Sequence, residues 1–233
     1  MLWAIFYDQC FMTKLMTKQT CRVVVLISGN GSNLQALIDQ QAAGLLPIDI
    51  VAVISNRPNV MGLQRAAKAN IPHQVVDHTE FDSRELFDTA LQQCIQQFTP
   101  DLVVLAGYMR IMTADLVRRF AGKMLNIHPS LLPKYPGLHT HRRALDNKDL
   151  QHGSSVHFVT EELDGGPVIA QSQFDIQPGD TEDSLAIRIK QLEHKLYPKV
   201  VGWFAENKIA LQGNQALYNG EKLLQPKMIQ TDL

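Results

Sequence analysis

Hydrophobic residues in the first half of the chain form short continuous runs that alternate with segments of helical spacing. A short, wholly apolar run is typical of a strand buried on both faces, and apolar residues three and four apart indicate the buried side of a helix. The runs predict strands at residues 23–27, 48–54, 74–76, 102–106 and 123–127, with helices at 33–43, 62–70, 82–98 and 113–120. This alternation predicts an α/β fold with an open, mainly parallel, twisted sheet of Rossmann-like type and helices on both faces.

The pattern changes after residue 141. Residues 154–160 and 168–176 predict two added strands in the C-terminal part, paired antiparallel because a short turn joins them. A long helix is predicted over 181–206, and Pro198 should kink or divide it because proline lacks the backbone N–H that a helix uses.

One folded domain is therefore expected at residues 21–211, between an N-terminal extension at 1–20 and a C-terminal tail at 212–233. The extension is predicted to be disordered, since it contains no strand or cap signal. The apolar residues near Trp3 follow no basic leader and precede no small-residue cleavage site, so no secretory signal is expected.

Composition narrows the class of protein. The chain has 233 residues, of which 45% are hydrophobic, enough for a full core. Its formal net charge of -1 offers no general attraction to nucleic acid or a membrane surface, and no apolar run approaches the ~18 residues of a membrane helix. The cysteines, Cys10, Cys21 and Cys94, are odd in number and lack paired spacing, so neither a disulfide framework nor a zinc site is expected. These features favour a cytoplasmic protein that acts on small molecules.

The segment Asn126-Ile-His-Pro-Ser-Leu-Leu-Pro-Lys-Tyr-Pro-Gly137 carries the clearest chemical signal. Residues two apart in a strand share one side, so Asn126 and His128 can converge on one small group at the end of their strand. The prolines that follow favour a stiff surface loop, and polar groups at such a strand end are a frequent active-site arrangement in open α/β sheets. The alternative is an ordinary strand end whose side chains only satisfy backbone groups.

Two glycine-rich turns strengthen the signal. Asp164, in Asp164-Gly-Gly-Pro167, supplies a carboxylate that can orient His128, although an Asp before two glycines is also a common turn cap. Ser28-Gly-Asn-Gly-Ser-Asn33 joins the first strand to the first helix, where free N–H groups can hold a phosphate; glycine needed only for the turn's dihedral angles is the alternative. Leu34 replaces the third glycine of the dinucleotide fingerprint, and the second strand ends at Ser55-Asn56 without an acidic ribose ligand, so a monophosphate is favoured over NAD.

Four motifs in this order resemble those of the phosphoribosylglycinamide formyltransferases, a family of folate-dependent enzymes of purine biosynthesis. The motifs are Gly29-Asn-Gly-Ser-Asn-Leu34, Leu105-Ala-Gly-Tyr-Met-Arg110, the 126–137 segment with Leu138-His-Thr-His141, and Leu163-Asp-Gly-Gly-Pro167. The resemblance covers residues 23 to 211. It implies transfer of the formyl group of 10-formyltetrahydrofolate, as co-substrate, to the amine of glycinamide ribonucleotide, without a metal, by a monomer or weak homodimer.

The resemblance also assigns roles to particular residues. Asn126, His128 and Asp164 would be catalytic. The ribonucleotide would be bound by Gly31, Ser32, Asn33, Gly107, Pro129, Lys190 and Glu193. The folate would be bound by Arg84, Met109, Arg110, Ile111, Met112, Asn126, Thr160, Glu161, Glu162, Leu163 and Asp164. Taken without the resemblance, Arg84, Lys190 and Glu193 are more typical of solvated helix faces.

In the implied reaction an amine attacks the formyl carbon, and the formyl oxygen becomes an oxyanion that needs hydrogen-bond donors. Asn126 would donate an amide N–H and a protonated His128 a charged N–H. Asp164 would favour the imidazolium and position a water for proton transfer.

Other functions fit part of the pattern. Methionyl-tRNA formyltransferases share the Asn-x-His segment but carry a C-terminal RNA-binding barrel, for which too few residues follow the core. Formyltetrahydrofolate hydrolases carry a regulatory domain and lack both the Gly29 motif and Lys134-Tyr-Pro-Gly-Leu-His-Thr-His141. A noncatalytic nucleotide- or folate-binding module is a further alternative. His139 and His141 do not have the spacing of a zinc pattern, so no metal site is expected.

Overall fold

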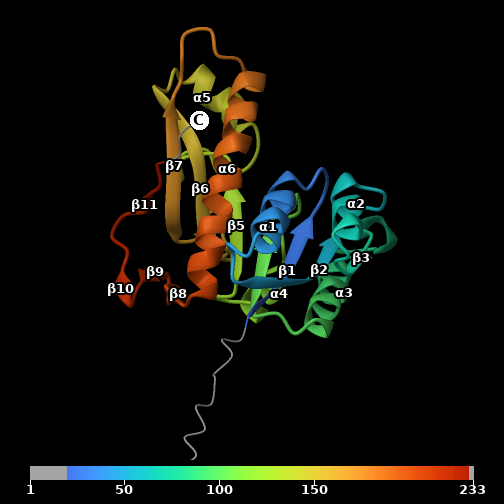
Figure 1. Cartoon of the computed structure of the whole chain (residues 1–233). Helices are drawn as coiled ribbons and strands as arrows, with labels where there is room; N and C mark the ends of the chain where they lie inside the picture. Colours follow the sequence, from blue (N-terminus) through green and yellow to red (C-terminus); the bar gives the residue numbers. More distant parts are fainter. Residues whose placement is uncertain (1–19, 231–233) are drawn as a thin grey trace, which may run out of the picture.

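A sheet of eight strands runs through the computed structural model, which describes residues 20–230 (Figure 1). The strand order is β11-β7-β6-β5-β4-β1-β2-β3. The parallel strands are β1 (Cys21–Ile27), β2 (Ile48–Ser55), β3 (His73–Val75), β4 (Leu102–Leu105) and β5 (Met124–His128). β6 (Gln151–Phe158) and β7 (Val168–Asp175) join antiparallel. The predicted fold class is confirmed, whereas the extension predicted at 1–20 lies, except for Thr20, outside the described residues.

Helices cover both faces of the sheet, as predicted. One face is covered by α1 (Ser32–Ala42), α2 (Met61–Lys68) and α6 (Glu182–Ala205), and the other by α3 (Arg84–Gln97), which follows a 3₁₀ turn (His78–Glu80), and α4 (Ala114–Arg119). The buried side chains of β1 explain its continuous apolar run. Val23, Val25 and Ile27 pack into the core beneath α1 and α6, while Val24 and Leu26 pack into the core beneath α3.

The long C-terminal helix α6 begins at a capping box in which Thr181 and Ser184 each bond the other's backbone N–H. Pro198 lies inside this helix and does not divide it, so the prediction of a division is wrong. Proline removes only one helical hydrogen bond, and the helix around Pro198 is held by its buried face. The Tyr197 hydroxyl, fully buried, lies 3.0 Å from the carbonyl oxygen of Leu105 and 2.9 Å from that of Leu125, which fixes α6 across β4 and β5.

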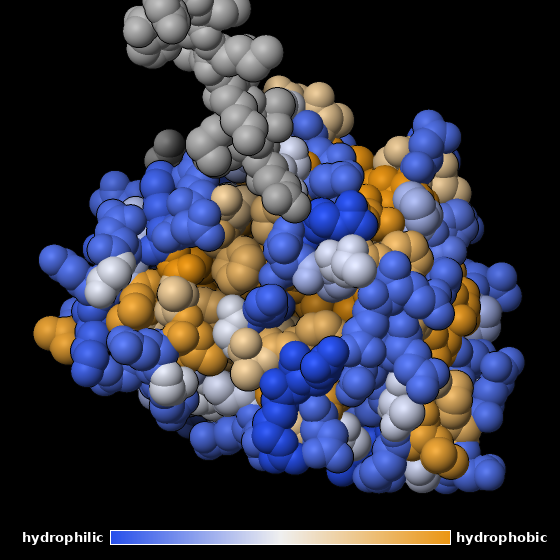
Figure 2. Space-filling model, turned by 90° about the horizontal axis from the view of Figure 1, so that it is seen from below, coloured by the Kyte–Doolittle hydropathy of each residue, from blue (hydrophilic) through white to orange (hydrophobic). Residues whose placement is uncertain are grey.

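Several elements form where the sequence shows no clear signal for them. A short helix, α5 (Thr140–Asp146), follows the proline-rich loop. The residues expected to form a tail contain strands β9 (Gln215–Tyr218) and β10 (Glu221–Lys222), which form a small antiparallel sheet with β8 (Ile209–Gln212), and β11 (Lys227–Met228), which pairs with β7. Figure 2 shows the molecule from below, where hydrophilic residues surround smaller hydrophobic areas. Among the described residues, no helix is long and apolar enough to cross a membrane.

The connection between β6 and β7 depends on Gly166, because a Cβ at this position would lie 1.8 Å from the Phe158 carbonyl oxygen. We expect Gly166→Ala to lower the free energy of unfolding by about 2 kcal/mol, the typical cost of overpacking a well-packed site. The measurement is urea denaturation, with Gly29→Ala as the control because a Cβ at Gly29 would meet nothing within 4 Å. Equal stability of the two variants would contradict this account of the turn.

Candidate active site

Four polar side chains meet at the carboxyl end of β5. Asn126 and His128 share one side of β5, His157 lies opposite Asn126 on β6, and Asp164 comes from the β6–β7 loop. The Asn126 Nδ2 atom lies 3.1 Å from His157 Nε2 and 3.4 Å from Asp164 Oδ1. The His128 Nδ1 atom lies 3.3 Å from Asp164 Oδ2. The structure therefore brings the three predicted catalytic residues together in one buried cluster.

The His128 imidazole lies between two oxygen acceptors. Its Nδ1 faces Asp164, and its Nε2 lies 2.9 Å from the carbonyl oxygen of Tyr135. Burial lowers the pKa of His128, and the bond to Tyr135 and the charge of Asp164 oppose this shift only in part. The expected pairing with Asp164 is present, but the direction of the pKa shift favours a neutral imidazole in the free protein.

The Asp164 carboxylate accepts hydrogen bonds that stabilise its charged form. Burial raises its pKa, but the interaction with His157, the 2.8 Å bond from the Gly137 N–H and the charge of His128 together lower it below the usual value. Asp164 also has a left-handed backbone, with φ of 51°. It is therefore a turn residue and an ionised partner of His128 at the same time.

His157 is a site residue that the sequence argument did not identify. Its Nδ1 lies 2.9 Å from the Phe158 carbonyl oxygen, so a proton on Nδ1 leaves Nε2 free to accept from the Asn126 amide. The β6–β7 register shifts between Val156 and His157, an irregularity of the kind that re-aims side chains beside active sites. The available signal was a histidine within an apolar strand, but its partner depends on the pairing of β6 with β5.

The glycine turn lies where the strand order reverses, between β1 and β4. The Ser28 N–H donates to the Gly107 carbonyl oxygen at 3.2 Å, which joins the ends of these two strands. Gly31 precedes α1 with φ of 71°, and no side chain caps this helix. The first N–H groups of α1, including those of Ser32 and Asn33, therefore have no side-chain cap and are available to an anion, at a position where ligands bind in open α/β sheets.

The Glu193 side chain connects this glycine turn to β6, the strand that pairs with β5. Its Oε2 accepts from Asn33 Nδ2 at 2.9 Å and its Oε1 from Ser154 Oγ at 3.1 Å. Glu193 is buried, and burial raises its pKa against the opposing effects of those two bonds and of the Lys190 charge. Lys190 itself is exposed on the same helix, and Pro129 directly follows His128. The structure thus brings Glu193 to the turn and leaves Lys190 on the surface near it.

A narrow slot of about 80 Å³ lies beside the catalytic cluster. Nine of the eleven residues predicted for folate line it: Arg110, Ile111, Met112, Asn126, Thr160, Glu161, Glu162, Leu163 and Asp164. His157, Tyr108, Leu105, Val117 and Val159 also line it and were not predicted. Met109 and Arg84 do not line the slot: Met109 is 67% exposed, and the side chain of Arg84 is 49% exposed.

A buried carboxylate supports one wall of this slot from behind. Asp88, on α3, accepts the Thr113 backbone N–H at 2.5 Å, at the residue that caps α4. Burial raises the pKa of Asp88, while its bonds to Thr113 and the charges of Arg84 and Arg110 act in the opposite direction.

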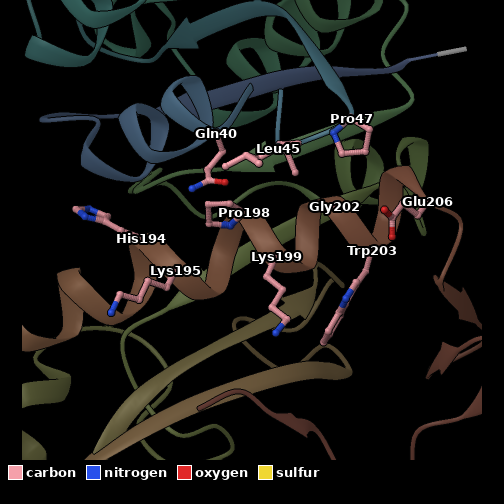
Figure 3. A pocket seen from close by; sticks show the side chains of 11 residues that line it. Gln40, Leu45, Pro47, His194, Lys195, Pro198, Lys199, Gly202, Trp203 and Glu206 are labelled. Atoms are coloured by element: carbon pink, nitrogen blue, oxygen red, sulfur yellow. The ribbon is translucent and has the colours of Figure 1, made fainter. Parts of the chain in front are cut away.

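Other features that the sequence singled out lie outside this slot. Within residues 20–230, no group of three or more His, Cys, Asp and Glu side chains is arranged to hold a metal ion. Cys94 is buried on α3, as its helical spacing predicted. A shallow groove of about 380 Å³ lies between the end of α1 and the second half of α6 (Figure 3). It is lined by Leu45, His194 and Trp203 among others, and by none of the predicted site residues.

Comparison with known proteins identifies the family of this chain. Residues 21–201 match the family described as Formyl transferase, and the chain belongs to that family. The phosphoribosylglycinamide formyltransferase of Escherichia coli (strain K12) is 51% identical over 201 residues, which are 86% of this chain and 95% of that protein. The solved structure of phosphoribosylglycinamide formyltransferase from Coxiella burnetii has a TM-score of 0.87 at 46% identity, covering 91% of this chain and 100% of that one.

A solved structure with another activity in its title shares the fold. The formyltetrahydrofolate deformylase from Pseudomonas syringae pv. tomato has a TM-score of 0.80 at 26% identity, covering 86% of this chain and 66% of that one. Fold similarity alone therefore does not separate the two activities, and the residues of the site have to do so.

The buried histidine pair behind the proline-rich loop predicts a loss of stability in acid. His152 Nε2 lies 2.9 Å from His141 Nδ1, and burial, together with the His141 charge, lowers the pKa of His152 to about 4. The folded state then binds fewer protons than the unfolded state between the ordinary pKa of about 6.5 and pH 4, so this stability is present above pH 6.5 and is lost as pH falls towards 4. The loss is on the order of 3 kcal/mol.

Urea unfolding at pH 7 and pH 4.5 tests this expectation. The wild-type protein should lose more stability between these two pH values than His152→Gln does, and the exposed-histidine control His73→Gln should behave as the wild type. If His152→Gln keeps the full pH dependence, the burial of His152 is not its source.

Proposed function

We propose that this protein transfers the formyl group of 10-formyltetrahydrofolate to the amine of glycinamide ribonucleotide, giving formylglycinamide ribonucleotide and tetrahydrofolate. The observation that carries the proposal is the position of the Asn126, His128 and Asp164 cluster at the same sheet edge as an uncapped glycine turn. The cluster alone does not indicate a phosphorylated substrate, and the glycine turn alone does not indicate formyl transfer. The names of the relatives with high identity support the same activity.

The reaction needs donors rather than a nucleophile on the enzyme. The substrate amine forms a bond to the formyl carbon while the carbonyl oxygen takes up negative charge, and the bond to the folate nitrogen then breaks. The proton lost by the attacking nitrogen goes to the departing one. Asn126 and His128 supply N–H groups to the oxyanion, and no covalent enzyme intermediate forms.

Both donors have to exchange a partner when substrate binds. The Asn126 amide contacts Asp164 at 3.4 Å, a longer contact than its 3.1 Å bond to His157, so the bond to Asp164 is the weaker of the two. His128 Nε2 would release the Tyr135 carbonyl oxygen. An oxyanion beside His128 raises the pKa of the imidazole that burial had lowered, so the charge on His128 develops together with the transition state.

Asp164 holds this arrangement in place. Its two oxygens face His128 Nδ1, the Gly137 N–H and the Asn126 amide, and its lowered pKa keeps it ionised at neutral pH. The fixed negative charge favours the imidazolium and orients the ring. A water placed by this carboxylate would pass the proton between the two substrate nitrogens.

The glycinamide ribonucleotide would lie with its phosphate on the turn. Backbone N–H groups of Gly31, Ser32 and Asn33 bind the phosphate, and Glu193 accepts a ribose hydroxyl. Lys190 adds a nearby positive charge from the surface of α6. Gly107 follows β4, where it accepts the Ser28 N–H, and Pro129 directly follows His128 at the end of β5, so both lie at the strand ends that the ribonucleotide would cross.

The folate would enter beside the 109–112 and 160–164 segments. Three large apolar side chains near the slot are exposed, with Met109 at 67%, Ile111 at 54% and Leu163 at 50%, and a bound ring would cover them. The slot of about 80 Å³ is far smaller than the ~300 Å³ that small-molecule sites usually reach. A pterin would therefore extend beyond the slot, over these exposed side chains.

The proposal also covers the molecules with which the protein interacts and its location in the cell. The substrates are small molecules, and the reaction as written uses no metal, nucleic acid or membrane. A cytoplasmic location and a monomeric or weakly dimeric state belong to the same proposal.

The second candidate is a hydrolase in which water replaces the amine, favoured by the fold shared with the deformylase. A hydrolase would need no site for a phosphorylated amine. The anion-ready turn at Gly31 and the buried Glu193 beside it favour the transferase.

A transfer assay decides between the two candidates. Purified protein is given 10-formyltetrahydrofolate with and without glycinamide ribonucleotide, and tetrahydrofolate and formylated ribonucleotide are both measured. We expect release of tetrahydrofolate only when the ribonucleotide is present, with turnover about a hundredfold lower in His128→Ala because a donor to the oxyanion is lost. Release of tetrahydrofolate without an acceptor would support the hydrolase.

Replacement of the Asp164 charge should change the pH dependence of turnover. Asp164→Asn keeps the shape of the side chain but removes the charge that raises the pKa of His128. If the pKa of His128 is lowered further, His128 loses its proton at a lower pH. The fall in turnover on the alkaline side should therefore begin at lower pH than in the wild type. Turnover should also fall by about tenfold or more at neutral pH. Lower thermal stability with an unchanged pH profile would instead make Asp164 a turn cap only.

A further inference from the structure

The carbonyl groups of the glycine turn are held by groups that lie after it in the chain. The Gly29 oxygen accepts the Gly62 N–H at 3.0 Å, and the Gly31 oxygen accepts the Gln35 N–H at 2.9 Å. Between them, the Asn30 oxygen accepts from the Nε of Arg65 at 2.9 Å. A turn can offer its N–H groups to an anion only while its carbonyl oxygens point away from that anion. These three bonds therefore determine the orientation of the peptide groups in the turn.

The Arg65 guanidinium makes the bond to the Asn30 carbonyl oxygen and two further hydrogen bonds. One terminal nitrogen donates to Asn30 Oδ1 at 3.3 Å and the other to Gln35 Oε1 at 3.1 Å. All three nitrogens of the half-buried side chain thus hold the turn and the first turn of α1 together. A planar fork of fixed geometry suits such a three-point contact.

The start of α2 packs closely against the glycine turn, and this contact places the Arg65 side chain beside Asn30. A Cβ on Gly31 would lie 2.7 Å from the Gly62 Cα, and a Cβ on Gly62 would lie 2.4 Å from the Ile27 Cδ1. The two backbones therefore touch at glycines. Arg65, three residues after Gly62, lies within reach of Asn30 because of this close approach.

We infer that Arg65 is a positioning residue for the phosphate of the substrate. It fixes the Asn30 peptide so that the N–H groups of residues 31–33 stay directed at the anion, and its positive charge favours the phosphate. This inference rests on the proposed function, because it names the part of the protein that lets the turn distinguish a phosphorylated amine from an unphosphorylated one.

Lys68 provides a matched comparison on the same helix. It is an exposed cation one turn beyond Arg65, and within residues 20–230 it makes no hydrogen bond to the turn. A general effect of positive charge on the phosphate would be shared by both residues. An effect of the fixed turn would belong to Arg65 alone.

The experiment compares Arg65→Gln, Arg65→Lys and Lys68→Gln with the wild type, using glycinamide ribonucleotide and its dephosphorylated riboside as acceptors. We expect Arg65→Gln to raise the KM for the ribonucleotide about tenfold or more, the usual effect of losing hydrogen bonds to a charged group. Its kcat and its KM for 10-formyltetrahydrofolate should stay near the wild-type values, and its KM for the riboside should change little. Arg65→Lys should be intermediate, and Lys68→Gln should match the wild type.

The outcomes separate the inference from the proposed function. A wild-type protein that does not formylate the ribonucleotide would refute the proposed function. If the wild type is active, the inference fails when Arg65→Gln weakens riboside and ribonucleotide by the same factor, or when it matches Lys68→Gln. It also fails if Arg65→Lys equals the wild type, since charge alone would then suffice. Melting curves establish that each variant is folded, and a poorly folded Arg65→Gln leaves Arg65→Lys, with its intermediate KM, as the deciding protein.

Discussion

The burial of an ionised carboxylate is the constraint on which the rest of the site depends. The side chain of Asp164 is 9% exposed, and a charge in such a place costs several kcal/mol unless donors surround it. The N–H groups that face this carboxylate come from Asn126 and His128 on β5 and from the loop at Gly137. These segments are brought together by the need to stabilise the carboxylate, and the same contacts fix the positions of Asn126 and His128.

The glycine turn proposed for the phosphate has the opposite charge requirement to the site around Asp164. A phosphate needs N–H groups and little negative charge, yet Glu193 lies against Asn33 in the anion-ready turn. Burial raises the pKa of Glu193, while the bonds that its two oxygens accept from Asn33 and Ser154 act in the opposite direction. The lowered pKa of Asp164 and the raised pKa of Glu193 give two carboxyl groups at one sheet edge different roles.

The parts of the fold that the sequence predicts are those governed by local periodicity. Strands β1, β2, β4 and β5 and the helices between them could be predicted because each buried run is bounded by helical spacing. Asn126 and His128 could be paired because residues two apart share a strand face. His157 could not be assigned, because its contact with Asn126 depends on the antiparallel register of β6 and a local irregularity. Arg65 was missed for a similar reason, since its partners depend on how α2 packs.

Errors at the C-terminal end have a comparable physical origin. Local chemistry at Pro198 predicted a kink or a division in α6, and the division is wrong because the buried face of that helix keeps it continuous. The strands after Leu211 are short and mostly exposed, so they lack the apolar runs that reveal a buried strand. Their existence follows from pairing rather than from their own sequence: β9 pairs with β8, β10 with β9, and β11 with β7.

Buried polar atoms without partners show how the site differs from the rest of the core. Among the described residues, these atoms are Asn33 Oδ1, Tyr108 OH, Arg110 Nε and His194 Nε2. Asn33 belongs to the turn proposed for the phosphate, while Tyr108 and Arg110 line the slot proposed for the folate. Each such atom lowers stability by the cost of its lost hydration, about 1–3 kcal/mol, unless a ligand or water satisfies it. Three of the four unpaired atoms thus lie where the two substrates would bind, so binding would relieve a cost that the free protein carries.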